Sequence, residues 1–433
     1  MTQQKNNSKL VAIIAMMFLF AMISFVTNMA APFGTIWKGH YEWAGMLGNM
    51  MNFAAYLFMG IPAGIMITKI GYKKTSLVAL ALGFIGICVQ YLSSALNEGA
   101  LSTYIIYLVG AFICGFCVCI LNTVVNPMLN LLGGGGNKGN QLIQTGGSLN
   151  SLAATLTPML AGMLIGSAAK NPGMGDVAPL LLIAMGIFAV SFVIIYFTNI
   201  MEPEQPTDNM IEMVSGALKY RHLVLGVIAI FFYVGVEVGI PGELLFYLPD
   251  YLSGGIEEKR TLAVAIAGSI AAIYWLLMLV GRFASSFISG VVSTRTQLIT
   301  VASVALVFLL IAIFIPESYT FQLPGTEKKP VDLFVLKFTG GVLPIKCLFI
   351  ILCGLCTSVM WGGIFNLATE GLGKYTAAAS GIFMTMVVGG GVMPLIQDQI
   401  ANAVGYIQSY WLIVAMVAYI LFYGLVGSKP AKK

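Results

Sequence analysis

The sequence predicts an all-α membrane protein with twelve transmembrane helices. Of its 433 residues, 58% are hydrophobic and only 9% are charged, whereas soluble domains are about one quarter charged. Apolar runs of about 20 residues recur along the whole chain, and each can cross a hydrocarbon core about 30 Å thick. The strands of a membrane barrel would be about 10 residues long with alternating polarity, so a barrel is excluded.

Each span is justified by an apolar run bounded by polar residues. Several runs contain Gly or Pro, which membrane helices tolerate when neighbouring groups satisfy the freed backbone. The first run follows two lysines, as the apolar region of a secretory signal does. It is longer than such a region, so we expect an uncleaved helix. The predicted spans are 10–36, 44–68, 75–95, 102–131, 140–167, 177–200, 223–251, 261–289, 297–315, 344–371, 376–402 and 408–427.

A polar stretch and a repeated motif divide the chain into two halves. Residues 201–222 hold two prolines and several charges between apolar runs. The pattern Cys-Gly-x-Cys occurs at 114–117 in the fourth span and again at 353–356 in the tenth. Such a match is expected of a duplicated six-helix unit. We therefore predict two six-helix pseudo-repeats, 1–200 and 223–433, joined by a cytoplasmic linker at 201–222.

The distribution of cations predicts the orientation in the membrane. Lys and Arg are enriched in cytoplasmic loops. With the N-terminus inside, 14 of the 22 Lys and Arg residues fall on the inner side, Arg282 among them, and 8 fall on the outer side, Lys38 and Lys346 among them. We therefore expect a multi-pass protein of the cytoplasmic membrane with both termini in the cytoplasm. The cations form no basic stripe, so we expect no nucleic-acid partner.

The polar residues inside the spans predict a binding site for a neutral solute. Such residues usually face a bundle interior or a water-filled path. Asn122 and Asn126 are four residues apart and share a helix face, whereas Gln144 and Asn150 diverge by roughly 120°. Amides suit hydroxyl groups, and aromatic rings suit the apolar face of a sugar. The predicted substrate-binding residues are Asn28, Asn122, Asn126, Gln144, Asn150, Tyr233, Tyr274, Trp361 and Asn366.

Alternative roles stay open for these residues. Interhelical Asn and Gln can be packing contacts worth about 1 kcal/mol each. Glu237 lies in the middle of the seventh span, where it is either an ion-coupling or substrate residue or half of a structural ion pair. Glu243, nearer the outer end, is expected to be a gate or a solvated residue. The sequence offers no catalytic triad and no metal cluster, so we expect no enzyme, cofactor or metal.

Several stretches resemble a known transporter family. "GIMITKIGYKK" (64–74) resembles the loop signature of the major facilitator superfamily, with Thr68 in place of its usual Asp. Four further stretches are similar to the fucose and glucose/galactose permeases of that superfamily, and the likeness covers nearly the whole chain. They are "NTVVNP" (122–127), "FYVGVEV" (232–238), "MLVGRF" (278–283) and "IFNLATEGLGKYTAAASG" (364–381).

The resemblance implies the major facilitator fold and transport of a monosaccharide by alternating access across a bacterial inner membrane. It implies a Glu where this chain has Asn122 and an Asp in the first span where this chain has Asn28, while Gln144 matches a sugar-binding Gln. An amide cannot take up a proton near pH 7. We therefore expect sugar recognition without the usual proton relay. Coupling to H⁺ or Na⁺ would then fall to Glu237, or there would be none.

Other functions remain as rivals. The substrate of a transporter of this kind could be another neutral solute, such as a nucleoside, an amino sugar or a drug. A non-transporting membrane sugar sensor should carry a sizeable cytosolic output segment, and the linker of about 20 residues looks too short for one. Beyond the lipid bilayer, a sugar and a co-transported ion, we expect no partner, and a monomer.

Overall fold

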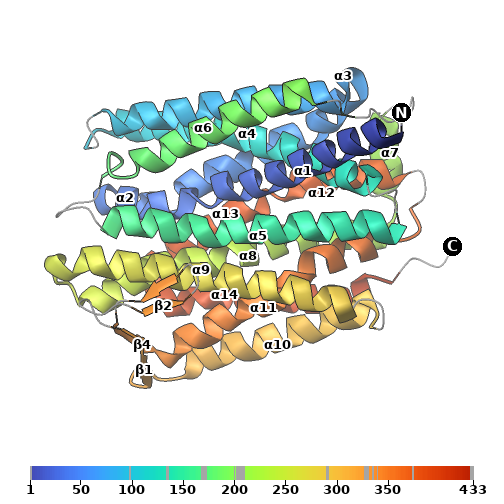
Figure 1. The fold of residues 1–433 in the computed structure, drawn as a ribbon. Helices are drawn as coiled ribbons and strands as arrows, with labels where there is room; N and C mark the ends of the chain where they lie inside the picture. Colours follow the sequence, from blue (N-terminus) through green and yellow to red (C-terminus); the bar gives the residue numbers. More distant parts are fainter. Residues whose placement is uncertain are drawn as a thin grey trace.

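A computed structural model describes residues 2–96, 99–132, 136–166, 173–198, 200, 210–288, 292–325, 331–333, 336–338, 340–372 and 375–429. Within these ranges, twelve helical segments are long and apolar enough to cross a membrane. They run side by side, and both termini lie at the end of the bundle opposite the short strands (Figure 1). We call these two ends the terminal end and the strand end.

The first six spans come from six long helices and a short turn. The first span bends between α1 and α2, and α3 carries both the second and the third span. These two spans meet at Gly71, whose φ of +82° favours glycine. The elements are α1 (Thr2–Thr27), α2 (Ala30–His40), η1 (Glu42–Ala44), α3 (Leu47–Ser94), α4 (Leu101–Leu132), α5 (Gly136–Gly166) and α6 (Ala178–Phe197).

The last six spans follow a short helix, α7 (Met210–Ala217). The eleventh span runs from α12 into α13. The helices are α8 (Arg221–Ser253), α9 (Glu257–Ile288), α10 (Thr294–Phe314), α11 (Ile345–Thr369), α12 (Thr376–Met386), α13 (Gly389–Val404) and α14 (Tyr406–Phe422), which ends in the turn η3 (Tyr423–Gly427).

Two small hairpins lie between α10 and α11, in a loop for which the sequence predicted no strands. β1 (Thr320–Gln322) pairs antiparallel with β4 (Val342–Pro344). β2 (Val331–Leu333) pairs antiparallel with β3 (Leu336–Phe338). Each strand has three residues, too few for an alternating pattern to stand out in the sequence.

The repeated Cys-Gly-x-Cys motif marks equivalent helix crossings in the two halves. A side chain at Gly115 in α4 would collide with the backbone carbonyl of Asn52 in α3, and one at Gly354 in α11 would collide with that of Tyr274 in α9. The fourth span thus packs closely on the second, and the tenth on the eighth. Small residues permit such close packing in membranes, and all seven cysteines carry free thiols.

The two sets of six spans meet along two lines of contact. α5 packs against α9, and a Cβ at Gly162 would lie 3.1 Å from the Cα of Gly268. α3 packs against α12 and α13, and a Cβ at Gly391 would lie 2.7 Å from the Cβ of Phe53. These contacts hold the central helices close together and position the polar residues considered next.

The twelve predicted spans are confirmed to within a few residues at most of their ends. The proposed limits of the halves, 1–200 and 223–433, stay a prediction, and residues 201–209 of the linker lie outside the described residues.

Candidate functional site

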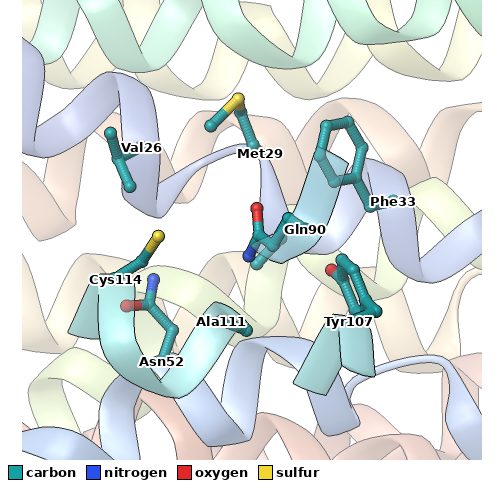
Figure 2. A pocket seen from close by; sticks show the side chains of 9 residues that line it. Val26, Met29, Phe33, Asn52, Gln90, Tyr107, Ala111 and Cys114 are labelled. Carbon is teal, nitrogen blue, oxygen red and sulfur yellow. The ribbon is translucent and has the colours of Figure 1, made fainter. Parts of the chain in front are cut away.

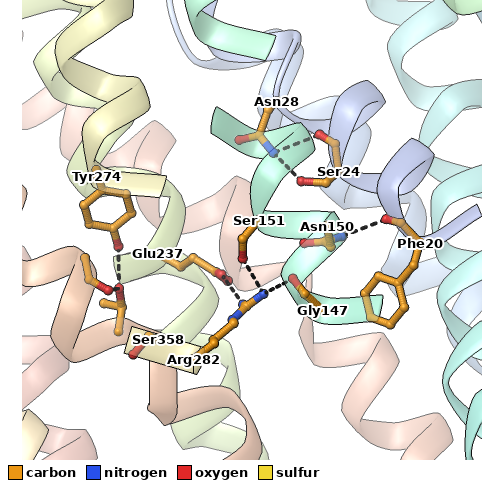
Figure 3. Close-up of polar contacts among 12 residues, drawn as sticks. Phe20, Ser24, Asn28, Gly147, Asn150, Ser151, Glu237, Tyr274, Arg282 and Ser358 are labelled. Atoms are coloured by element: carbon orange, nitrogen blue, oxygen red, sulfur yellow. Dashed lines mark hydrogen bonds and ion pairs between the residues drawn. The ribbon is translucent and has the colours of Figure 1, made fainter. Parts of the chain in front are cut away.

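Asn28 lies at the bend of the first span, between the end of α1 and the start of α2. Its amide Nδ2 donates to Ser24 O at 2.8 Å and to Ser24 Oγ at 3.1 Å (Figure 3). These bonds use the donor side of the amide. Asn28 is only half-buried, and no hydrogen bond from a described residue reaches its Oδ1, which leaves that oxygen as an acceptor.

Asn122 and Asn126 lie on one face of α4, as their spacing predicts, and both are half-buried. The Nδ2 of Asn122 donates to the hydroxyl of Tyr56 in α3 at 2.8 Å. The Nδ2 of Asn126 donates to the backbone O of Asn122 at 3.0 Å. Both amides therefore have an internal partner on the donor side, as in the packing alternative, and no described residue donates to either side-chain oxygen.

α5 carries the two remaining amides of the first half. The Nδ2 of Asn150 donates to the backbone O of Phe20 in α1 at 3.0 Å, so this residue ties α5 to α1 (Figure 3). Gln144 belongs to α5, but its side chain lies outside the described residues. Its predicted contact with the substrate therefore stays a prediction.

Three aromatic residues of the second half come together from α8, α9 and α11. The rings of Tyr233 and Trp361 pack edge to face with centroids 6.1 Å apart. The hydroxyls of Tyr274 and Thr357 share a hydrogen bond of 2.9 Å. Tyr233 and Tyr274 are fully buried, and Trp361 is half-buried.

Asn366 does not join this group. It is exposed near the end of α11 and lines a separate groove, and its contact with the substrate stays a prediction. Only five residues separate it from Trp361, but at 1.5 Å per residue it lies more than a helical turn further along the axis. The groove is lined by Ser293, Thr294, Arg295, Asn366, Leu367, Glu370, Ser428 and Lys429.

Arg282 links α9 to helices of both halves, and the sequence analysis missed this role. Its Nη2 lies 3.5 Å from Oε1 of Glu237 in α8. Its Nη1 donates to Ser151 Oγ at 2.8 Å and to Gly147 O at 3.1 Å, both in α5 (Figure 3). The side chains of Arg282 and Glu237 are 16% and 15% exposed.

The assignment of Arg282 to the cationic loops was therefore wrong. Its position within an apolar run, together with a lone mid-span carboxylate at Glu237, was the signal available in the sequence, because intramembrane charges usually pair. Of the two readings of Glu237, the structure shows the ion pair. Tyr233, one helical turn before Glu237, lies within electrostatic range of both members of the pair.

A small cavity lies beside the bend of the first span (Figure 2). Its volume is about 10 Å³, which is enough for roughly one water molecule. A monosaccharide does not fit there. The lining residues are Val26, Met29, Ala30, Phe33, Asn52, Gln90, Tyr107, Ala111 and Cys114.

The strand end of the bundle is closed by contacts between the halves. Lys38 Nζ in α2 lies 2.7 Å from Asp398 Oδ1 in α13. The Nδ2 of Asn49 in α3 donates to Gly390 O in α13 at 2.8 Å. Glu243 in α8 is only 1% exposed, so the expectation of a solvated residue was wrong, and the gate alternative remains.

The sequence profile of the Major Facilitator Superfamily matches residues 10–394. The chain belongs to this superfamily. It is 30% identical over 437 residues to a protein of Brucella abortus named glucose/galactose transporter, covering 99% of this chain and 96% of that one. It is 22% identical over 406 residues to the L-fucose-proton symporter of Escherichia coli, covering 88% and 83%. The predicted resemblance is thereby confirmed.

Solved structures of the superfamily share the fold. The fucose symporter FucP of Escherichia coli, crystallised in the outward conformation, superposes with a TM-score of 0.67 at 18% identity, covering 96% of this chain and 98% of that one. The nucleoside transporter NupG gives a TM-score of 0.63 at 13% identity, covering 98% and 100%. The chain is a multi-pass membrane protein with the major facilitator fold.

Proposed function

We propose that this chain carries a neutral monosaccharide of the glucose, galactose or fucose type across the bacterial inner membrane by alternating access. The observations that support this most are half-buried neutral amides in the first half and a half-buried aromatic ring in the second. Asn28, Asn122 and Asn126 are half-buried amides of the first half, and no described residue donates to their side-chain oxygens. Trp361, which is half-buried and packs on Tyr233, offers ring surface from the second half.

The chemistry of this set suits hydroxyl groups and the C–H face of a sugar ring. A charged solute would need an opposite charge left free at the site. Among the described residues of the set, the charges of Glu237 and Arg282 are turned toward each other. The names of the two relatives agree with a sugar as the substrate.

We propose further that Asn28 and Asn122 stand where the proton-coupled permeases have carboxyl groups. Neither amide can exchange a proton, so coupling, if the transporter accumulates its substrate, falls to Glu237. A cation arriving at Glu237 would compete with Arg282, whose other contacts hold α5. Such an exchange would transmit ion binding from α8 to the opposite half.

The orientation is part of the same proposal. Without Arg282, the predicted inner side still holds more loop cations than the outer side, which favours cytoplasmic termini. The strand end would then face outward. A fluorescent protein that matures only in the cytoplasm, fused after the last residue, should light up, and a dark fusion that is present in the membrane would reverse the assignment.

Substrate class is tested first by binding to the purified protein. We expect isothermal titration to detect at least one of glucose, galactose and fucose, and to detect neither uridine nor a cationic drug. Asn122→Ala should weaken sugar binding by about tenfold, since one lost hydrogen bond is worth about 1.5 kcal/mol. Gln408→Ala, an exposed amide change on α14, is the matched control. Binding of the nucleoside with no response to any of the sugars would overturn the proposal.

A further inference from the structure

Three charged side chains meet where the halves close the strand end. Lys38 comes from α2 of the first half, and Glu243 and Asp398 come from α8 and α13 of the second. Lys38 Nζ lies 2.7 Å from Asp398 Oδ1, and the same ammonium faces the ring of Phe246, which follows Glu243 by about one helical turn on α8. Asp398 is 0% exposed and Glu243 is 1% exposed.

Glu243 is buried without a partner for either carboxyl oxygen among the described residues. The residues beside it on α8 contact Lys38 and a methionine. The ring of Phe246 lies 4.3 Å from Lys38 Nζ, and a Cβ at Gly242 would collide with the methyl group of Met46. A buried carboxylate with no hydrogen bond is strongly unfavourable.

The charges of the cluster do not balance. Two ionised carboxylates and one ammonium would leave a net negative charge at two buried acids, and a single lysine, whose side chain is 13% exposed, cannot satisfy both. One further positive charge is needed. A hard metal ion would require a shell of oxygen ligands, whereas among the described residues this cluster adds only aromatic rings, an ammonium and a thioether to its two carboxyl groups. A proton requires no such shell.

We propose that Glu243 and Asp398 together bind one proton when the strand end is closed and release it when that end opens. Opening moves Lys38 away with the first half and admits water to both acids, so that both can ionise. Proton uptake and closure are therefore linked equilibria. Acidification favours the closed strand end, by at most about tenfold in the ratio of closed to open molecules per pH unit.

The other titratable groups facing this cluster are satisfied or solvent-exposed. The Tyr406 hydroxyl donates to Asp250 at 2.7 Å, and Asp250 also pairs with Arg260. Tyrosine hydroxyls ordinarily titrate at about pH 10, so they stay uncharged between about pH 5 and about pH 8. His40 is exposed at the same end of α2 and needs its own control. The remaining groups are Tyr410, bonded to Ile240 O; Tyr104, bonded to Ala44 O; Glu317, paired with Lys346; and exposed Glu42.

This proton is distinct from any ion that drives transport. It enters and leaves at the strand end, because the site lies between the halves there and is buried while that end is shut. It therefore controls how readily the transporter opens to that side and carries no charge across the membrane. The inference rests on alternating access alone and holds whatever solute is carried.

Pulsed electron–electron resonance on the full chain in lipid nanodiscs tests the proposal. Spin labels are placed at two exposed positions of the strand end. Gly39 lies on α2, and Tyr319 lies in the segment between α10 and β1. Native cysteines are replaced beforehand. Without any sugar, the fraction of molecules with the short distance between labels, which marks the closed strand end, should fall as the pH is raised from about 5 to about 8. Glu243→Gln, which mimics the protonated acid, should stay closed over the whole range.

Two controls separate the cluster from other titrating groups. Glu258→Gln removes an exposed carboxylate at the same end, and His40→Gln removes the exposed imidazole; both should keep the wild-type pH response. Infrared spectra give a second readout: the C=O stretch of a protonated carboxylic acid should be present in the closed protein and reduced in Glu243→Gln. A distance distribution that ignores pH in the wild type, or a Glu243→Gln variant with an unchanged pH response, would overturn the proposal.

Discussion

Arg282 in α9 donates a hydrogen bond of 2.8 Å to Ser151 in α5, and the same guanidinium faces Glu237 in α8. One side chain therefore joins the fifth span to the seventh and eighth. In a protein whose halves rock against each other, such a contact lies across the line of movement. Under the proposed alternating access, we infer that a change at Glu237 reaches the first half through Arg282.

Removing Arg282 alone should be more damaging than removing both members of the pair. Arg282→Met leaves the Glu237 carboxylate buried without its partner, which costs about 3–5 kcal/mol of stability. Arg282→Met/Glu237→Gln removes that unpaired charge and should recover much of the loss. Thermal unfolding in detergent of the two single variants and the double variant provides the cycle. Additive losses would mean that the two groups do not interact.

The glycine of the repeated motif should tolerate no side chain. Gly354→Ala would press a methyl group into the Tyr274 carbonyl, and such overpacking costs about 1–3 kcal/mol. Gly362→Ala, two turns further along α11, meets nothing within 4 Å and should be neutral or stabilising by about 0.5–1 kcal/mol. Unfolding midpoints of the two variants decide the matter. Equal midpoints would show that the close crossing is not required.

Trp361 should supply ring surface to the sugar. Trp361→Ala is expected to weaken sugar binding about tenfold or more, because an aromatic ring and its burial contribute about 1.5 kcal/mol or more. Trp411→Ala changes an exposed tryptophan of α14 that packs on Phe314 and should leave the affinity unchanged. Titration calorimetry measures both. Parallel losses in the two variants would point to general destabilisation instead of a contact with the sugar.

Restoring a carboxyl group at Asn122 should change the energetics of transport. Asn122→Glu places an ionisable group beside Tyr56, where the wild-type amide only donates a hydrogen bond. Sugar uptake by this variant should then respond to a proton gradient more strongly than uptake by the wild type. Asn122→Gln, with the same length and no ionisable group, is the control. If uptake by the Glu and Gln variants responded alike to the proton gradient, Asn122 would not occupy the position of a coupling acid.

The spans were predictable because the thickness of the bilayer fixes their length and polarity, and that constraint is local in the sequence. The equivalent halves were visible through Gly115 and Gly354, whose motif repeats because both glycines serve the same crossing. The hairpins between α10 and α11 were not, because three-residue strands give no periodic signal.

The pairing of the charges could not be read from the sequence. Lys38 and Asp398 are separated by 360 positions, and their contact depends on how α2 packs against α13. The same holds for Arg282, whose place near the end of a span looked like a loop until α5 and α8 were seen beside it. Tertiary packing determines which of these charged groups meet.

The most direct test of the proposed function is uptake of labelled glucose, galactose and fucose into proteoliposomes that contain the purified chain. It is run with no gradient, with an inward proton gradient and with an inward sodium gradient, and empty liposomes are the control. We predict uptake of at least one of the sugars. Accumulation above equilibrium under one gradient, lost in Glu237→Gln, would identify Glu237 as the coupling residue, and equilibration that ignores both gradients would identify a facilitator. Failure to take up any of the sugars, with protein that is folded and inserted, would contradict the account.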